Sequence, residues 1–189
     1  MGIEIGALAR RIGELPPLAG STRVIAIDGP AGSGKTTLAA QLGEQLAGSF
    51  VLNTDQLYHG WDGLADGAQR LVDDVLLPLS EDRAATVRPW DWGSSSEGEQ
   101  RELPGCETLI VDGAGCGSRA AAPLLSMIIW LDADPALRQR RALERDGEMF
   151  APHWQSWAAQ ERELFAREQT RERADLIILT DTDPPQSTR

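Results

Sequence analysis

Short apolar runs alternate with segments of helical periodicity along most of the chain. Between the runs, apolar residues recur at intervals of three and four, which predicts helices. Strands that alternate with helices form a parallel sheet with right-handed crossovers. We therefore expect an α/β fold with a five-stranded parallel sheet flanked by helices and with ligands beyond the carboxyl ends of the strands. The predicted strands are RVIAID (23–28), FVLN (50–53), ETLIVDG (107–113), SMIIWLDAD (126–134) and ADLIILTD (174–181).

The two ends of the chain and one central stretch depart from this alternation. Residues 1–22 predict an N-terminal amphipathic helix that stops before Pro16-Pro17, and residues 182–189 predict a tail. The polar residues 80–105 predict an irregular segment, either a substrate loop or a partly mobile stretch. The main domain is expected to span residues 23–181. Its helices are expected at 37–47, 66–79, 135–148 and 153–173.

The junction between the first strand and its helix carries a complete phosphate-binding pattern. Its residues, GPAGSGKT at 29–36, match G-x-x-x-x-G-K-[ST], which predicts the P-loop NTPase fold. The glycines let the backbone wrap around phosphate oxygens, and the helix start directs amides toward them. Lys35 would bind the β- and γ-phosphates, and the Thr36 hydroxyl would ligate Mg²⁺. The residues expected to bind ATP are Gly29, Ala31, Gly32, Ser33, Gly34, Lys35, Thr36 and Thr37; the preference between ATP and GTP stays open.

Aspartates follow the first three predicted strands, where a P-loop fold holds its chemistry. Asp112, at the end of the run LIVD, is expected to hold Mg²⁺ directly or through water, although it could instead cap a turn. Asp55 is the candidate for activating an acceptor hydroxyl, with a helix N-cap as the alternative. Asp28 leads directly into the phosphate-binding loop.

The charge and composition narrow the classes of function. The chain has 18 basic and 29 acidic residues, a net charge of −11, which disfavours a nucleic-acid partner. Lys35 is the single lysine among those basic residues. No stretch approaches the ~20 apolar residues of a membrane span, and no secretion signal is visible at the start. The two cysteines, Cys106 and Cys116, are expected to be reduced thiols in the cytoplasm.

Arginines gather on one predicted helix. Arg138, Arg141 and Arg145 would share a face at 100° per residue, so they could neutralise charge on a transferring phosphoryl group. The alternative is a solvated helix face paired with Glu144 and Glu148.

In their order, these segments resemble the uridine kinase-like family of P-loop kinases. The matching segments are IAIDGPAGSGKTTLA, DQLY at 55–58, VRPWDW at 87–92, VDG at 111–113 and LRQRRALERD at 137–146. The resemblance implies that Asp55 activates the acceptor and that a small lid, about 135–150, carries Arg141 and Arg145. It also implies an acceptor pocket bordered by Tyr58, His59, Trp90 and Asp91 and reached by Arg101. The chain departs from the family pattern at Leu57, where an aromatic stands, and at Asp112, where a glutamate stands. Its lid also has an extra residue before Arg145 and lacks the glycine-arginine that usually follows.

Tryptophans are concentrated near the expected acceptor pocket. Trp61, Trp90 and Trp92 could stack on a nucleobase or could fill the core. The function expected is ATP-dependent phosphoryl transfer to a hydroxyl of a small molecule, with a uridine-like nucleoside as the first choice. A nucleoside monophosphate is an alternative acceptor, because its phosphate could be bound by Arg83, Arg88 and Arg101, and another metabolite is also possible. A further alternative is a P-loop ATPase or switch without kinase activity. The partner expected is a small-molecule acceptor, and a homo-oligomer is compatible with the sequence.

Overall fold

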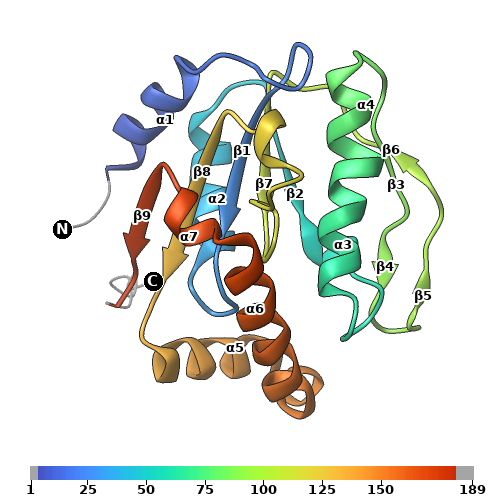
Figure 1. Cartoon of the computed structure of the whole chain (residues 1–189), viewed down its shortest axis with the longest axis vertical. Coiled ribbons are helices and arrows are strands. Elements are labelled where there is room, and N and C mark those ends of the chain that lie inside the picture. Colours follow the sequence, from blue (N-terminus) through green and yellow to red (C-terminus); the bar gives the residue numbers. More distant parts are fainter. Residues whose placement is uncertain (1–3, 182–189) are drawn as a thin grey trace, which may run out of the picture.

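The computed structural model describes residues 4–181, which fold around one parallel sheet (Figure 1). The order of its strands is β2-β7-β1-β8-β9, with β1 at the centre, and every neighbouring pair runs parallel. The sheet confirms the predicted five-stranded P-loop fold. Its strands are β1 (Arg23–Asp28), β2 (Ser49–Asn53), β7 (Thr108–Asp112), β8 (Met127–Asp132) and β9 (Leu176–Leu179).

Alternate residues of the central strand enter two separate cores. Val24 and Ala26 of β1 belong to one buried cluster, and Ile25 and Ile27 belong to another. Successive side chains of a strand point to opposite faces, so each cluster lies on its own face of the sheet. Helices cover both faces, which explains why β1 and β7 are almost entirely buried and have apolar residues at their centres.

The helix near the N-terminus is part of the core. In α1 (Ile5–Gly13), Leu8, Ala9 and Ile12 are buried in the same cluster as residues of α2 (Lys35–Gln45). The amphipathic helix expected in residues 1–22 therefore packs its apolar side on the sheet and α2. The expected tail at 182–189 lies outside the described residues.

The predicted helix at 66–79 is longer and less regular than expected. It consists of α3 (Leu64–Arg70), a π-helical stretch (Leu71–Leu76) and α4 (Leu77–Ser80). Pro78 lies in the first turn of α4, so it does not close the helix.

Two predicted helices are interrupted by residues with positive φ. In α5 (Pro135–Phe150), Gly147 has a φ of 56° and a ψ of −136°, which divides the helix by a kink. The helix predicted at 153–173 is α6 (Trp154–Glu168) followed by α7 (Thr170–Arg173). Gln169 between them is left-handed, with a φ of 51°, and a left-handed residue ends a helix.

The segment predicted to be irregular forms two small antiparallel pairs beside α3. In the first pair, β3 (Thr86–Val87) lies beside β6 (Arg101–Glu102). In the second, β4 (Trp90–Asp91) lies beside β5 (Ser96–Glu97). They form an arm away from the central sheet (Figure 1). Short 3-10 helices complete the described chain at Thr54–Gln56, Ala122–Leu124 and Ala151–His153. In residues 4–181, no helix has the length and apolar character that crossing a membrane requires.

Candidate functional site

The loop between β1 and α2 has the backbone shape that its glycines predict. Gly29, Gly32 and Gly34 have φ values of 139°, 77° and 94°, which residues other than glycine rarely adopt. A Cβ at Gly29 would collide with the backbone of Leu131, and one at Gly32 with the backbone of Arg138. Strand β8 and helix α5 therefore press directly on this loop.

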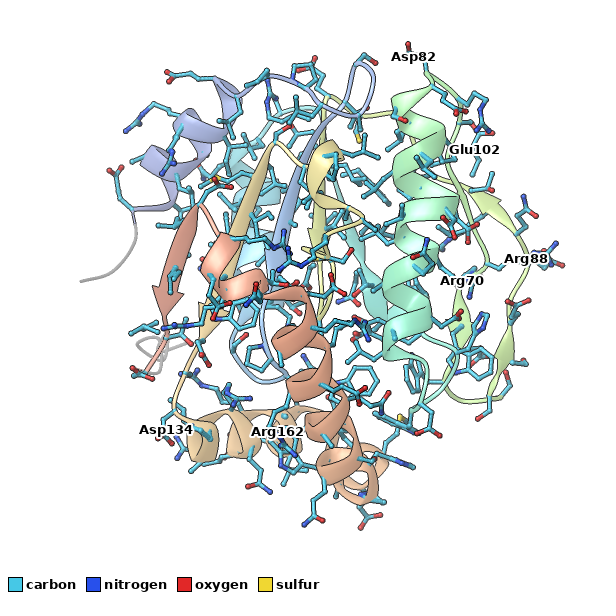
Figure 2. The ribbon with its side chains drawn as sticks, viewed as in Figure 1. Arg70, Asp82, Arg88, Glu102, Asp134 and Arg162 are labelled. Atoms are coloured by element: carbon cyan, nitrogen blue, oxygen red, sulfur yellow. The ribbon has the colours of Figure 1, made fainter. Side chains whose placement is uncertain are left out.

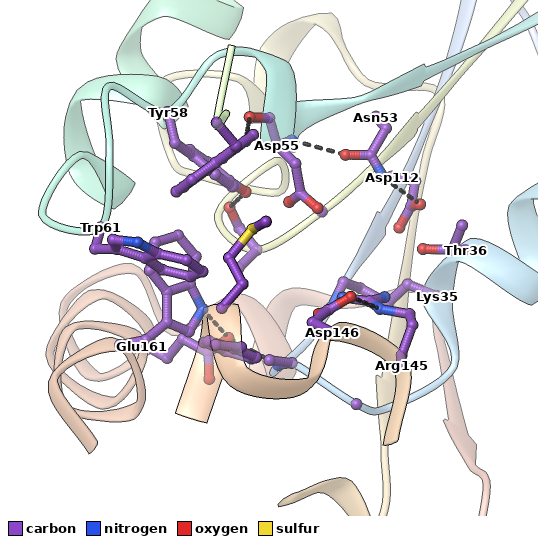
Figure 3. A pocket seen from close by; sticks show the side chains of 18 residues that line it. Lys35, Thr36, Asn53, Asp55, Tyr58, Trp61, Asp112, Arg145, Asp146 and Glu161 are labelled. Atoms are coloured by element: carbon purple, nitrogen blue, oxygen red, sulfur yellow. Dashed lines mark hydrogen bonds and ion pairs between the residues drawn. The ribbon is translucent and has the colours of Figure 1, made fainter. Parts of the chain in front are cut away.

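A cavity of about 540 Å³ opens from this loop at the carboxyl ends of β1, β2 and β7 (Figure 3). It lies between the loop, α5 and α6. The structure thus brings ten of the predicted site residues to one space: Ala31, Gly32, Lys35, Thr36, Asp55, Tyr58, Trp61, Trp92, Asp112 and Arg145. The rest of its lining comprises Asn53, Gly113, Ala114, Asp146, Met149, Phe150, Trp157 and Glu161.

Asp112 and Thr36 form an oxygen-rich corner of the cavity. Asn53 Nδ2 donates to Asp112 Oδ2 at 3.1 Å, whereas the buried Oδ1 has no hydrogen-bond partner in the described structure. Burial raises the pKa of Asp112, and Lys35 and the Thr36 hydroxyl counteract that rise. An unpartnered carboxylate oxygen beside a hydroxyl is a donor set that suits Mg²⁺, so the residues present fit the ion expected from the sequence.

Asp55 lines the cavity, and its carboxylate has no hydrogen-bond partner among the described residues. The N-cap of its short 3-10 helix is Asn53, whose Oδ1 accepts from the Asp55 amide at 2.7 Å. The Asp55 side chain is open to the cavity, yet the surrounding protein desolvates it and so raises its pKa. The positive charge of Lys35 opposes this rise of the pKa. The carboxylate is therefore available to a second molecule in the cavity.

Aromatic side chains form the end of the cavity that lies away from Asp112. Trp61 is stacked on Phe150, with ring centroids 5.2 Å apart, and meets Trp157 edge-on at 6.2 Å. Trp92 lies 4.6 Å from Trp61, and its Nε1 donates to the Asp55 carbonyl at 3.0 Å. Tyr58 is buried behind them, and its hydroxyl donates to the Ala114 carbonyl at 2.8 Å. This end offers flat apolar faces next to the free carboxylate of Asp55.

The three arginines expected on one face of the lid helix have different partners. Arg145 lines the cavity and bonds Asp146 at 2.6 Å, which raises the pKa of Arg145. Arg141 instead donates to the Thr180 carbonyl at 2.9 Å and to its hydroxyl at 3.1 Å. Arg138 donates to the Ala133 carbonyl at 3.1 Å. Of the two expected lid arginines, the structure therefore brings only Arg145 to the described cavity.

His59 and Trp90 lie outside the cavity. His59 Nε2 is 2.8 Å from Glu97 Oε1, and its ring also contacts Arg70. Trp90 lies beside His59, with ring centroids 5.4 Å apart, and its Nε1 is buried without a partner among the described residues. Both side chains join the β4–β5 pair to α3, so they stabilise the arm next to the site.

The remaining predicted acceptor residues also lie on this arm. Asp91 accepts hydrogen bonds from the backbone of its own turn, at Gly93 and Ser94. Arg101 is exposed and bonds the side chain of Gln56. Arg88 points outward from the arm in Figure 2 and bonds Gln100. Neither they nor the exposed Arg83 line the cavity, so the arginines considered for a phosphorylated acceptor are not at the site.

Two buried carboxylates bond the phosphate-binding loop in ways that the sequence does not predict. Glu161 of α6 is 3% exposed, lines the cavity and accepts from the Ala31 amide at 2.7 Å. Asp28 is fully buried and accepts from the amides of Gly29, Gly115 and Gly117 at 2.7–2.8 Å. Asp28 was noticed at the start of the loop, but its long-range bonds have no sequence signal. Glu161 sits one helical turn after Trp157, a spacing typical of any buried helix face.

The chain matches known proteins by family and by fold. The AAA_18 family model, described as an AAA domain, matches residues 25–152. A candidate uridine kinase from Bacillus stearothermophilus is similar in structure, with a TM-score of 0.64 and 21% identity over 92% of this chain and 96% of that one. A candidate fructose transport system kinase from Silicibacter sp. TM1040 has a TM-score of 0.65 and 22% identity over 94% and 100%. YFH7 from Saccharomyces cerevisiae, a candidate P-loop kinase with a circular permutation, has a TM-score of 0.61 and 10% identity over 96% and 100%. The search of curated proteins found no match. These likenesses confirm the P-loop NTPase fold that the sequence predicts.

Proposed function

The chain belongs to the AAA_18 family of AAA domains, and we propose that it transfers the γ-phosphoryl group of ATP to a hydroxyl of a small molecule. One observation carries the proposal: the phosphate-binding loop and the free carboxylate of Asp55 line the same cavity, together with an aromatic wall. A P-loop protein that only hydrolyses ATP has no need of such a compartment for a second molecule.

Each group at the site has a role in this reaction. Bound ATP and Mg²⁺ supply the phosphoryl group and neutralise its charge. The loop amides and Lys35 would hold the phosphates, and Thr36 and Asp112 would hold the ion. Asp55 would take the proton of the acceptor hydroxyl as its oxygen bonds to phosphorus and the bond to ADP breaks. Arg145, on the proposed lid helix α5, would balance charge at the transferring group.

The lining also narrows the class of acceptor. Flat side chains beside Asp55 suit a nucleoside, so a uridine-like nucleoside is the first acceptor to test. Arg145, the cavity's one arginine among the described residues, is bonded to Asp146, which disfavours an acceptor that already carries a phosphate. The similarity to candidate kinases of uridine and fructose supports an uncharged hydroxyl compound. We also propose a cytoplasmic reaction, in keeping with the free thiols of Cys106 and Cys116.

The proposal is tested by ADP release from Mg·ATP in the presence of nucleosides, nucleoside monophosphates, sugars and amino alcohols. We expect at least one acceptor without a phosphate to stimulate ADP release, and the Lys35→Ala variant to abolish that stimulation. Selective turnover of a monophosphate would refute the proposed acceptor class and leave the kinase reaction standing. ADP release that no acceptor changes would favour an ATPase or switch.

A further inference from the structure

Glu161 brings a negative charge to the cavity where the phosphate loop meets the aromatic wall. Its Oε1 atom is already used, because it accepts from the Ala31 amide at 2.7 Å and from Trp157 Nε1 at 3.0 Å. No described group hydrogen-bonds Oε2, although the side chain is 97% buried and lines the cavity. Oε2 is thus the oxygen of this carboxylate that is open to the cavity, and a ligand that brings a charged donor to it would form a strong hydrogen bond.

The other charges of the cavity point to the same kind of ligand. Its described lining has four carboxylates, of Asp55, Asp112, Asp146 and Glu161, and two cations, Lys35 and Arg145. Arg145 is bonded to Asp146, and Lys35 belongs to the phosphate loop. Lys35 and Arg138 partly compensate the charge of Glu161. The described lining still has two more carboxylates than cations, so a second molecule meets a negative field at this end.

The aromatic faces next to Glu161 also favour a cation. Figure 3 shows Trp61 and Glu161 on the side of the cavity opposite Thr36 and Asp112. Trp157 lies between them, edge-on to Trp61 and bonded to Glu161. Trp61 is stacked on both Phe150 and His153, with ring centroids 5.2 and 4.5 Å apart, whereas Trp157 has only edge-on ring contacts in the described structure. The indole of Trp157 can therefore attract an ammonium group through its quadrupole, most strongly where water is excluded.

We propose that the acceptor is a hydroxyl compound with a positively charged nitrogen group. That group would bind between Glu161 and the indole of Trp157, while the hydroxyl would lie at Asp55. The proposal rests on the proposed kinase function and narrows its acceptor from any compound without a phosphate to an organic cation.

The first test compares two probes that differ in charge alone. Choline and 3,3-dimethyl-1-butanol have the same shape and the same hydroxyl, but choline has a quaternary nitrogen where the other has carbon. Binding to the wild-type chain, preloaded with Mg²⁺ and a non-hydrolysable ATP analogue, is followed by tryptophan emission. We expect choline to bind at least about tenfold more tightly. Equal affinity, or tighter binding of the neutral alcohol, would overturn the proposal.

A variant then assigns the preference to Glu161. Glu161→Gln retains an oxygen that can accept from Ala31 and Trp157 but removes the charge, so the ratio of the two dissociation constants should fall toward one. Glu163→Gln makes the same change on the exposed side of the same helix and should leave the ratio as it is. A preference for choline that survives Glu161→Gln unchanged would refute the role of this residue. Because these measurements need no turnover, failure of the kinase reaction would be seen separately, as absent ADP release with every acceptor.

Discussion

Asp28→Asn tests how the phosphate loop is attached to the loop that follows β7. Asp28 Oδ1 accepts from the amides of Gly29 and Gly115, and Oδ2 accepts from Gly117. An asparagine has the same shape, and its carbonyl oxygen can still accept two of these hydrogen bonds. Its NH₂ group then faces the third backbone N–H, so two donors meet and that hydrogen bond is lost. A lost hydrogen bond to a charged group costs about 1.5–3 kcal/mol. Burial raises the pKa of Asp28, so part of the advantage of the carboxylate is already offset, and we expect about 2 kcal/mol of lost stability.

For a chain of this length, that loss lowers the melting temperature by about 4–8 °C. The measurement is thermal and urea unfolding of the wild type and the variant. Asp91→Asn is the matched control, because Asp91 also accepts from two backbone amides, of Gly93 and Ser94, but is exposed to water. We expect the control to change stability by less than about 0.5 kcal/mol. If Asp28→Asn were as mild as the control, the three buried bonds would not stabilise the junction and the reasoning would fail.

The other predictions concern the proposed reaction. Lys35→Ala should lower acceptor-dependent ADP release by about 100-fold or more, with circular dichroism unchanged, because the lysine binds phosphate charge and is not part of the core. Asp55→Asn should abolish transfer but preserve the dissociation constant of an ATP analogue. Burial raises the pKa of Asp55 above 3.8, so on acidification the wild-type enzyme should lose activity at a higher pH than it would with an unperturbed aspartate. Asp112→Asn should raise the Mg²⁺ concentration needed for half-maximal activity. Arg145→Ala should lower kcat, whereas Arg141→Ala should lower the melting temperature, because Arg141 bonds Thr180 at the end of β9.

Much of the fold could be predicted because its signals are local. Apolar runs of strand length mark all five strands of the sheet, and the phosphate loop carries its own turn chemistry. The departures are local as well. Gly147 and Gln169 interrupt helices that the periodicity extends, since periodicity records which residues are apolar and not which backbone angle each adopts. The strands of the arm are two residues long, too short to show alternation.

The part of the site at the loop and the strand ends could be predicted from local signals, whereas Trp61, Trp92 and Arg145, which also line the cavity, had alternative roles in the core or on a solvated face. Lys35, Asp55 and Asp112 reach the cavity because parallel strands end at one edge of the sheet. Arg141 does not reach it, since its direction depends on where α5 meets the end of β9, which sequence spacing does not determine. Glu161 binds Ala31 across 130 positions of the chain. Such contacts arise from the tertiary packing of α6 on the loop.

One helix gives the cavity both of its chemical characters. Before the kink at Gly147, α5 contributes Arg145 and Asp146 to the charged half; after the kink, it contributes Met149 and Phe150 to the apolar half. Glycine permits the kink because its φ of 56° with a ψ of −136° lies in a region that other residues avoid. The change of helix direction places both halves against the same space. A transfer reaction requires this arrangement, because phosphoryl donor and acceptor must meet within one enclosure that excludes water.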